Sequence, residues 1–293
     1  MALLVPGLPA ARLNLRARLR SRLGAGSRWL DGLVLAVVAL AVLLAVFGPL
    51  IAPGTVTTSN ILDAMQAPSA HHWFGTDDQG RDVAWRIVAG ARESLLSALL
   101  VVAGYSLIGC VIAAAAAFGG KLVDEILMRL TDAVLAIPTI IFALGFAAAL
   151  GPGLNSAIIA LVITAWPVTA RLLRGEIRQT LAMPYVAGAR VLGMSRRRLL
   201  FRHILPNSLD ALVVKWGADV GSTVLVITSL SFIGAGPQPP SPEWGAMVSE
   251  GANYITSSWW MALFPGLAIA VVAVAFALLA DLIQERMAAG GER

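Results

Sequence analysis

Long apolar runs alternate with shorter polar connections along most of the chain. Six of these runs approach or exceed the roughly 20 residues that cross about 30 Å of hydrocarbon as a helix. They occupy residues 33–52, 95–118, 133–150, 154–170, 209–235 and 259–280. We expect a kink at Pro138 in the third run and an interruption at Pro167 near the end of the fourth. The pattern therefore predicts an all-α integral membrane protein with six transmembrane helices.

Composition and charge support that prediction and orient the helices. Of the 293 residues, 58% are apolar and 13% are charged, whereas soluble domains carry about 25% charged residues. Lysine and arginine gather before the first run, in the 119–132 turn, between the fourth and fifth runs, and near the C-terminus. Cytoplasmic loops carry such an excess, so we expect both termini in the cytoplasm and residues 53–91 and 236–257 outside. Binding of nucleic acid is not expected, because the excess of positive residues in cytoplasmic loops of membrane proteins already explains the basic charge.

The basic start of the chain, residues 1–29, holds six arginines and no acidic residue. A basic segment before an apolar run resembles a signal peptide. The run is long enough to span the membrane and more spans follow, so we predict an uncleaved first helix. Leucine and arginine alternate over residues 13–23, which fits a helix on the cytoplasmic surface of membrane lipid. A basic tail without fixed structure fits equally well.

The basic insert at residues 184–207 carries signals for two short helices. Pro184 suits the first position of a helix, where its missing N–H costs nothing. Gly193 tolerates the left-handed conformation that ends helices, and Ser195 can cap a second helix. Pro206 is expected to stop that second helix. The small side chains near the middle of the first helix leave a flat face that can enter a groove on another protein; a basic loop that binds lipid headgroups is the alternative.

The same insert resembles the signature loop of ABC-importer permeases. That loop has Glu-Ala-Ala, then three residues and a glycine, and later Leu-Pro; here the corresponding residues are Ala187-Gly188-Ala189, Gly193 and Leu205-Pro206. Ala187 replaces the glutamate that helps to anchor the loop in the family. The resemblance implies that the insert contacts an ATPase. The residues it assigns to this contact are Pro184, Tyr185, Ala187, Gly188, Ala189, Arg190, Gly193, Met194, Ser195, Leu205 and Pro206.

Three further segments narrow the resemblance to the oligopeptide and dipeptide branch of these importers. They are HHWFGTDDQGRDVAWRIVAGARESL at residues 71–95, SLSFIGAGPQPPSPEWGAMVSEG at 229–251, and the last apolar run. Together they resemble the second, C-type permease of the pair, which implies the type I ABC importer permease fold in a bacterial inner membrane. The implied divisions are a cytoplasmic segment at 1–29, a first helix at 30–52, an external loop at 53–91, a permease domain at 92–282 with its coupling loop at about 176–207 and an external loop at 236–257, and a tail at 283–293.

The resemblance also implies partners. Two homologous permease subunits form one path, an external binding protein delivers a peptide, and two ATPase subunits or domains bind ATP and Mg²⁺. This chain lacks the Gly-x-x-x-x-Gly-Lys-Ser/Thr phosphate loop, so we expect neither a bound cofactor nor enzymatic activity. Nickel chelates or haem are the alternative substrates, since the same branch handles them.

Ionisable residues inside the runs are functional candidates by default. Asp219 is the most interior, and Lys215 lies four residues earlier on the same helical face. We favour an ion pair that stabilises the helix, with a place in the transport path as the alternative. A secondary transporter or channel would need several such charges. An intramembrane enzyme would need a base beside Cys110, and no histidine lies within the runs.

The external 53–91 segment is polar and rich in turn residues. Thr76 or Asp77 is expected to cap a short helix there. His71, His72, Asp77 and Asp78 are metal-ligating residue types. The adjacent histidines lack the i,i+4 spacing of helical metal sites, so we interpret the segment as an ordinary polar loop without a metal.

Overall fold

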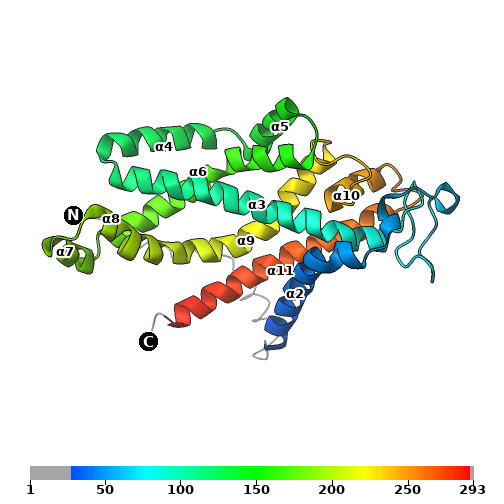
Figure 1. The fold of residues 1–293 in the computed structure, drawn as a ribbon, viewed down its shortest axis with the longest axis horizontal. Coiled ribbons are helices and arrows are strands. Elements are labelled where there is room, and N and C mark those ends of the chain that lie inside the picture. Colours follow the sequence, from blue (N-terminus) through cyan, green and yellow to red (C-terminus); the bar gives the residue numbers. More distant parts are fainter. Residues whose placement is uncertain (1–27, 291–293) are drawn as a thin grey trace, which may run out of the picture.

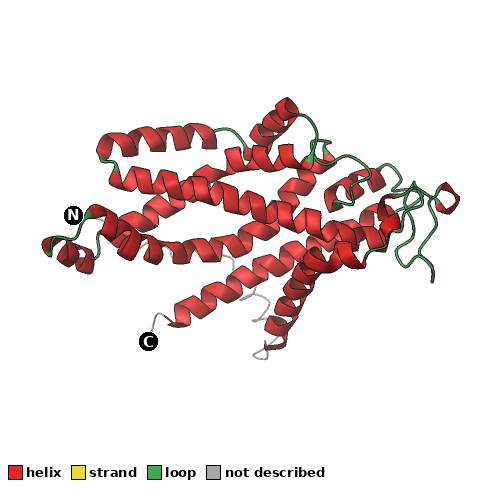
Figure 2. Cartoon of the chain, viewed as in Figure 1, coloured by secondary structure: helices red, strands yellow, loops and turns green. Residues whose placement is uncertain are grey.

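The computed structural model describes residues 28–290, and these residues are helical without a regular strand (Figure 2). The predicted N-terminal basic segment lies almost wholly outside the described residues. The longest helices run side by side, with the 184–207 insert at one end and residues 54–82 at the other (Figure 1). The helices are α2 (Arg28–Ile51), α3 (Val83–Phe118), α4 (Lys121–Leu135), α5 (Thr139–Leu150), α6 (Leu154–Leu181), α7 (Pro184–Val191), α8 (Arg196–Leu199), α9 (Leu205–Phe232), α10 (Trp244–Ala252) and α11 (Trp260–Gly290), with short 3₁₀ turns η1 (Gly54–Thr57) and η2 (Ile61–Asp63) and a π-helical turn (Leu200–Ile204).

Five helices in the described range are long and apolar enough to cross a membrane: α2, α3, α6, α9 and α11. A sixth span arises if α4 and α5 count together, but these two helices meet at 85°. The expected kink in the third run is therefore a complete break, and residues 133–150 are not one helix. Pro138 explains the break, because proline donates no backbone hydrogen bond and keeps the preceding residue out of the helical conformation.

The charged 119–132 turn is also mostly helix, which corrects the prediction of a loop. One face of α4 carries aspartates that pair with arginines of α6. Asp124 accepts a hydrogen bond from Arg174 Nη2 at 2.6 Å and from Arg178 Nη2 at 2.5 Å, and Asp132 pairs with Arg171. These contacts hold α4 along the end of α6 that leads into the 184–207 insert.

α3 and α6 extend well beyond the apolar runs that predicted them. α3 begins at Val83, and its cap is Asp82 rather than Thr76 or Asp77, since Asp82 Oδ1 accepts a hydrogen bond from Trp85 N at 3.0 Å. α6 passes through Pro167 without interruption and continues to Leu181. Pro167 is buried in a tightly packed stretch, so tertiary packing outweighs its local tendency to break a helix.

The centre of the bundle is the contact between α3 and α6. Small residues permit the close approach, as expected for helices packed in lipid. A Cβ on Gly104 would lie 2.7 Å from Val162, and one on Gly109 would lie 2.9 Å from Thr169. A smaller apolar group, which we call the basal cluster, packs under the 184–207 insert. Its buried members are Ala113, Leu173, Ile177, Val186, Leu199, Ile204 and Leu212.

Candidate functional site

Residues 184–207, which we call the projecting segment, extend beyond the bundle at one end (Figure 1). The predicted local signals are present. α7 begins at Pro184, Gly193 has a φ of +79°, and Ser195 Oγ accepts a hydrogen bond from Arg198 N at 3.4 Å. The helix–glycine turn–helix geometry predicted from the sequence is therefore confirmed.

The expected stop at Pro206 is wrong. The chain passes from α8 through the π-helical turn directly into α9, with Leu205 N bonded to Leu200 O. Pro206 occupies one of the first two positions of α9, where a missing N–H is tolerated. The π turn shifts the hydrogen-bond register by one residue and makes room for the ring. The second helix of the projecting segment is thus continuous with a membrane-crossing helix.

α7 is anchored by its buried side rather than at the family's glutamate position. Val186 is fully buried in the basal cluster, and Asn207 Nδ2 donates to Tyr185 Oη at 2.9 Å. Ala189 and Met194 pack against the same cluster, and Arg190 lies in α7. Ala187 is exposed. The anchoring contacts therefore come from the residues around Ala187.

The outer face of α7 is small and apolar. Pro184, Ala187, Gly188 and Val191 follow the i, i+3, i+4, i+7 spacing of one helical face, and all four are exposed. Val191 and the adjacent Leu192 are each 87% exposed. These exposed apolar side chains make the outer face of α7 the candidate interaction surface of the projecting segment.

The predicted ion pair inside the bundle is present. Lys215 Nζ pairs with Asp219 on α9, and Tyr105 of α3 donates its hydroxyl proton to the same carboxylate. Lys215 Nζ also lies 5.2 Å from the centre of the Tyr105 ring. Both charged side chains are about four-fifths buried. The cluster ties α9 to α3, and Tyr105 was not foreseen because its sequence position gives no sign of this contact.

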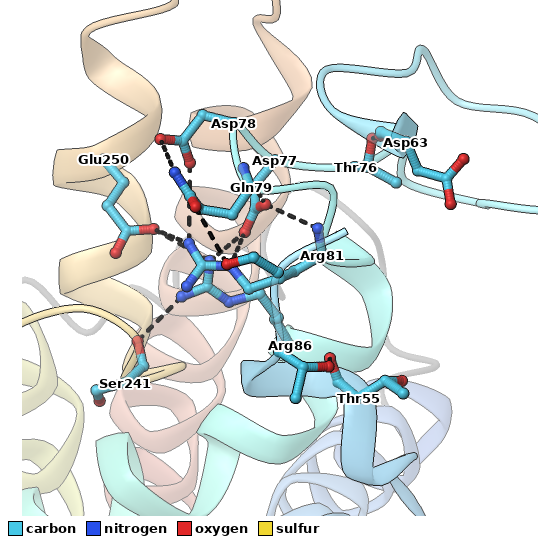
Figure 3. A network of polar contacts seen from close by, with 12 residues as sticks. Thr55, Asp63, Thr76, Asp77, Asp78, Gln79, Arg81, Arg86, Ser241 and Glu250 are labelled. Carbon is cyan, nitrogen blue, oxygen red and sulfur yellow. Dashed lines mark hydrogen bonds and ion pairs between the residues drawn. The ribbon is translucent and has the colours of Figure 1, made fainter. Parts of the chain in front are cut away.

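A second polar group lies at the opposite end of the bundle, where Asp77, Arg81, Arg86 and Glu250 form what we call the buried ion network (Figure 3). Arg81 Nε bonds Asp77 Oδ2 at 2.7 Å, and Arg81 Nη2 lies 3.2 Å from Glu250 Oε2. Arg86 Nη1 contacts both carboxylates, at 3.1 Å for Glu250. The side chains of Asp77, Arg81 and Arg86 are each less than 5% exposed.

The network joins three separate parts of the chain. Asp77 and Arg81 belong to the irregular segment before α3, Arg86 to the first turn of α3, and Glu250 to α10. Arg86 Nη2 also donates to Ser241 O at 3.1 Å. The sequence offered one signal for it, the i,i+4 spacing of Asp77 and Arg81, and none for the contact with α10.

The four candidate metal ligands, His71, His72, Asp77 and Asp78, do not converge on one point. His72 Nδ1 lies 2.9 Å from Asp82 Oδ2, and within the described range neither histidine joins a group of three ligand atoms. Oxygens of Asp77, Asp78 and Glu250 do lie within 4.8 Å of one another. Two guanidinium groups, of Arg81 and Arg86, already pair with these three carboxylates.

The loop predicted at 236–257 contains a short helix, α10, that was not predicted. Glu243 caps this helix and accepts hydrogen bonds from Gly245 N and Ala246 N, both at 2.9 Å. Its side chain is almost completely buried, and this burial raises the pKa of the carboxyl group. Trp244 Nε1 donates to Ile87 O at 2.9 Å, so α10 is fixed against α3 beside the buried ion network.

Comparisons with known proteins agree with the resemblance found in the sequence. Residues 106–289 match the family described as "Binding-protein-dependent transport system inner membrane component". A probable D,D-dipeptide transport system permease of Escherichia coli is 40% identical over 88% of this chain and 87% of its own length. A dipeptide transport system permease of Alkalihalophilus pseudofirmus is 37% identical over 84% of this chain and 81% of its own length.

Solved structures confirm the predicted type I ABC importer permease fold. An inward-facing structure of the MetNI methionine ABC transporter aligns with a TM-score of 0.56 at 18% identity, over 69% of this chain and 96% of that one. An amino acid ABC transporter crystallised with histidines aligns with a TM-score of 0.53 at 20% identity, over 69% of this chain and 94% of that one. By family match, sequence identity and fold, the chain belongs to the binding-protein-dependent transport system inner membrane components.

Proposed function

We propose that this chain is a permease subunit of an ATP-driven peptide importer and that the projecting segment couples it to an ATPase. The observation that carries the proposal is the exposed apolar face of α7 on a segment continuous with α9. In this arrangement a second homologous permease completes the path, two ATPase subunits bind ATP and Mg²⁺, and an external binding protein delivers the peptide. The charge distribution supports a cytoplasmic position for the projecting segment and both termini.

Coupling needs a surface that the partner holds more tightly in one conformation than in another. Burial of Val191 or Leu192 in a groove of the ATPase would contribute about 1.5–3 kcal/mol for each side chain. Coupling also needs a rigid connection to the membrane helices. The π-helical turn into α9 and the buried Val186 supply that connection, so a displacement of α7 is passed to the α9 side of the path.

The substrate proposal rests on the relatives. The two curated permeases described above are named for D,D-dipeptide and dipeptide transport, and others are named for oligopeptide and glutathione transport. These names favour peptides over the nickel chelates or haem that remain the alternative. The lack of a phosphate loop in the chain supports ATP hydrolysis on the partner subunits.

The coupling proposal is tested with Leu192→Asp. Leu192 is 87% exposed, so the variant is expected to fold and insert. A carboxylate buried in the groove of the ATPase should abolish both co-purification with the ATPase and the stimulation of ATP hydrolysis. Leu62→Asp is the matched control, because Leu62 is 93% exposed at the opposite end of the bundle. Equal amounts of ATPase recovered with both variants would contradict the proposal.

The substrate is tested by uptake in cells from which the chain has been deleted. Uptake of a labelled dipeptide should be lost on deletion and restored by the wild-type chain but not by Leu192→Asp. Loss of labelled nickel or haem uptake, with dipeptide uptake intact, would favour the alternative substrates instead.

A further inference from the structure

A groove opens between α2 and α3 on the outside of the bundle. It has a volume of about 260 Å³. Its floor is formed by buried side chains from three helices, Leu95, Val220 and Phe276. Its walls are exposed apolar side chains. The wall residues are Val42, Val46, Leu96 and Leu99, with 46–52% of each side chain exposed.

Arg92 is the only charged residue that lines this groove in the described part of the chain. Its side chain is exposed, and it makes no hydrogen bond or ion pair with any residue between 28 and 290. The adjacent Glu93 makes no ion pair with it within the described residues; Glu93 Oε2 instead accepts a hydrogen bond from Ser241 Oγ at 2.5 Å. The groove therefore combines an apolar channel with a free guanidinium group.

The position of Arg92 along α3 places it near the membrane surface. The apolar run at 95–118 rises about 36 Å at 1.5 Å per residue, which covers the hydrocarbon thickness of about 30 Å. Arg92 lies one turn before that run, and Trp85 lies two turns further out, as expected of an aromatic residue at the interface. A flexible arginine stem at this level reaches the headgroup layer while its methylenes contact apolar side chains.

We propose that this groove binds one anionic phospholipid, with an acyl chain between α2 and α3 and the phosphate on Arg92. Charge complementarity selects an anionic headgroup, since the guanidinium group has no protein partner. The lipid would fill the space between α2 and the rest of the bundle and fix the angle of α2.

The affinity of the site is tested by native mass spectrometry of the purified full-length chain. The protein is titrated with dioleoylphosphatidylglycerol or dioleoylphosphatidylcholine, and the first bound lipid is quantified. Arg92→Gln should lower the affinity for phosphatidylglycerol about fivefold, which corresponds to about 1 kcal/mol. The affinity for phosphatidylcholine should fall less, because its choline cation offsets the charge of the phosphate. Arg129→Gln is the control, since Arg129 is exposed on α4 outside the groove. An unchanged affinity for phosphatidylglycerol in Arg92→Gln overturns the proposal.

The occupant is tested in the assembled transporter in its native membrane. A benzophenone amino acid at Val46 is activated by light, and the products are separated by mass. A phospholipid adduct that declines in the Arg92→Gln background is the expected result. An adduct to another polypeptide, or the absence of any lipid adduct, shows that the groove is not a lipid site. Neither measurement depends on the transported substrate or on the ATPase contact, so the lipid site can fail without affecting the proposed function.

Discussion

Replacement of Arg86 by methionine tests whether the buried ion network stabilises the fold. The Arg86 side chain is 1% exposed and contacts Asp77, Glu250 and a backbone carbonyl. Methionine fills much of the same volume but leaves two carboxylates with a single arginine, Arg81. Removing one partner of a buried pair costs about 3–5 kcal/mol, because a charge remains without compensation. At about 2–4 °C per kcal/mol, the melting temperature should fall by roughly 6–20 °C.

The measurement is a thermal melt of the purified protein in detergent, followed by tryptophan fluorescence. Trp244 and Trp260 make hydrogen bonds next to the network, so their emission reports its loss. Arg129→Met is the matched control, since the Arg129–Glu125 pair has side chains 78% and 54% exposed and such pairs contribute about 0–1 kcal/mol.

The same reasoning predicts a partial rescue. In the double variant Arg86→Met, Glu250→Gln, the surplus carboxylate is removed, so the protein should recover part of the lost stability. The ionic explanation is wrong if Arg86→Met and the Arg129→Met control have the same melting temperature. It is also wrong if Glu250→Gln lowers the melting temperature of Arg86→Met by as much as it lowers that of the wild-type protein.

Three further predictions concern other contacts. Gly90→Ala should destabilise the protein by about 1–3 kcal/mol or more, since the new Cβ would lie 1.8 Å from the carbonyl oxygen of Pro242. Gly145→Ala is the control; nothing lies within 4 Å of its Cβ, so it should be neutral or slightly stabilising. Equal melting temperatures of the two variants would contradict the close contact at Gly90. Asp219→Asn should lower the melting temperature, and Lys215→Gln in the same chain should restore part of it. A folded double variant that no longer supports transport would instead place the pair in the path. Burial raises the pKa of Glu243 above its ordinary 4.5, so the folded protein keeps this proton to a higher pH than the unfolded chain does. The contribution of Glu243 to stability therefore falls as the pH rises above about 4.5. In a pH series of melting temperatures, Glu243→Gln should reduce this decline, and an unchanged slope would refute the assignment to Glu243.

Features set by local chemistry were predictable from the sequence. The apolar runs predicted the membrane-crossing helices because a span requires a fixed length of apolar residues. Gly193 predicted its turn because a positive φ is costly for other residues. The exposure of Leu192 in the projecting segment was not predicted, because the exposure of a side chain depends on where the neighbouring helices end.

Features that depend on distant contacts were not predictable. The break after α4 was expected only as a kink. Pro138 marks its place in the sequence, but the contact that holds α4 against α6 joins Asp124 to Arg174, 50 residues away. Pro206 was expected to end a helix, since the π-helical turn that accommodates it is not visible in local propensities. The contact between Arg86 and α10 has no counterpart in residue spacing at all.

The separation of the network's two halves has a consequence for biosynthesis. Arg86 and Glu250 are 164 residues apart in the chain. At a synthesis rate of about 5–20 residues per second, Glu250 emerges roughly 8–33 s after Arg86. During that interval the nearby Asp77 is the partner available to Arg86, and the arginine cannot be enclosed until α10 arrives. The last helices to be made therefore complete the N-terminal end of α3, a helix that was inserted much earlier. A chain that stalls before residue 250 exposes an unfinished ionic site to quality control.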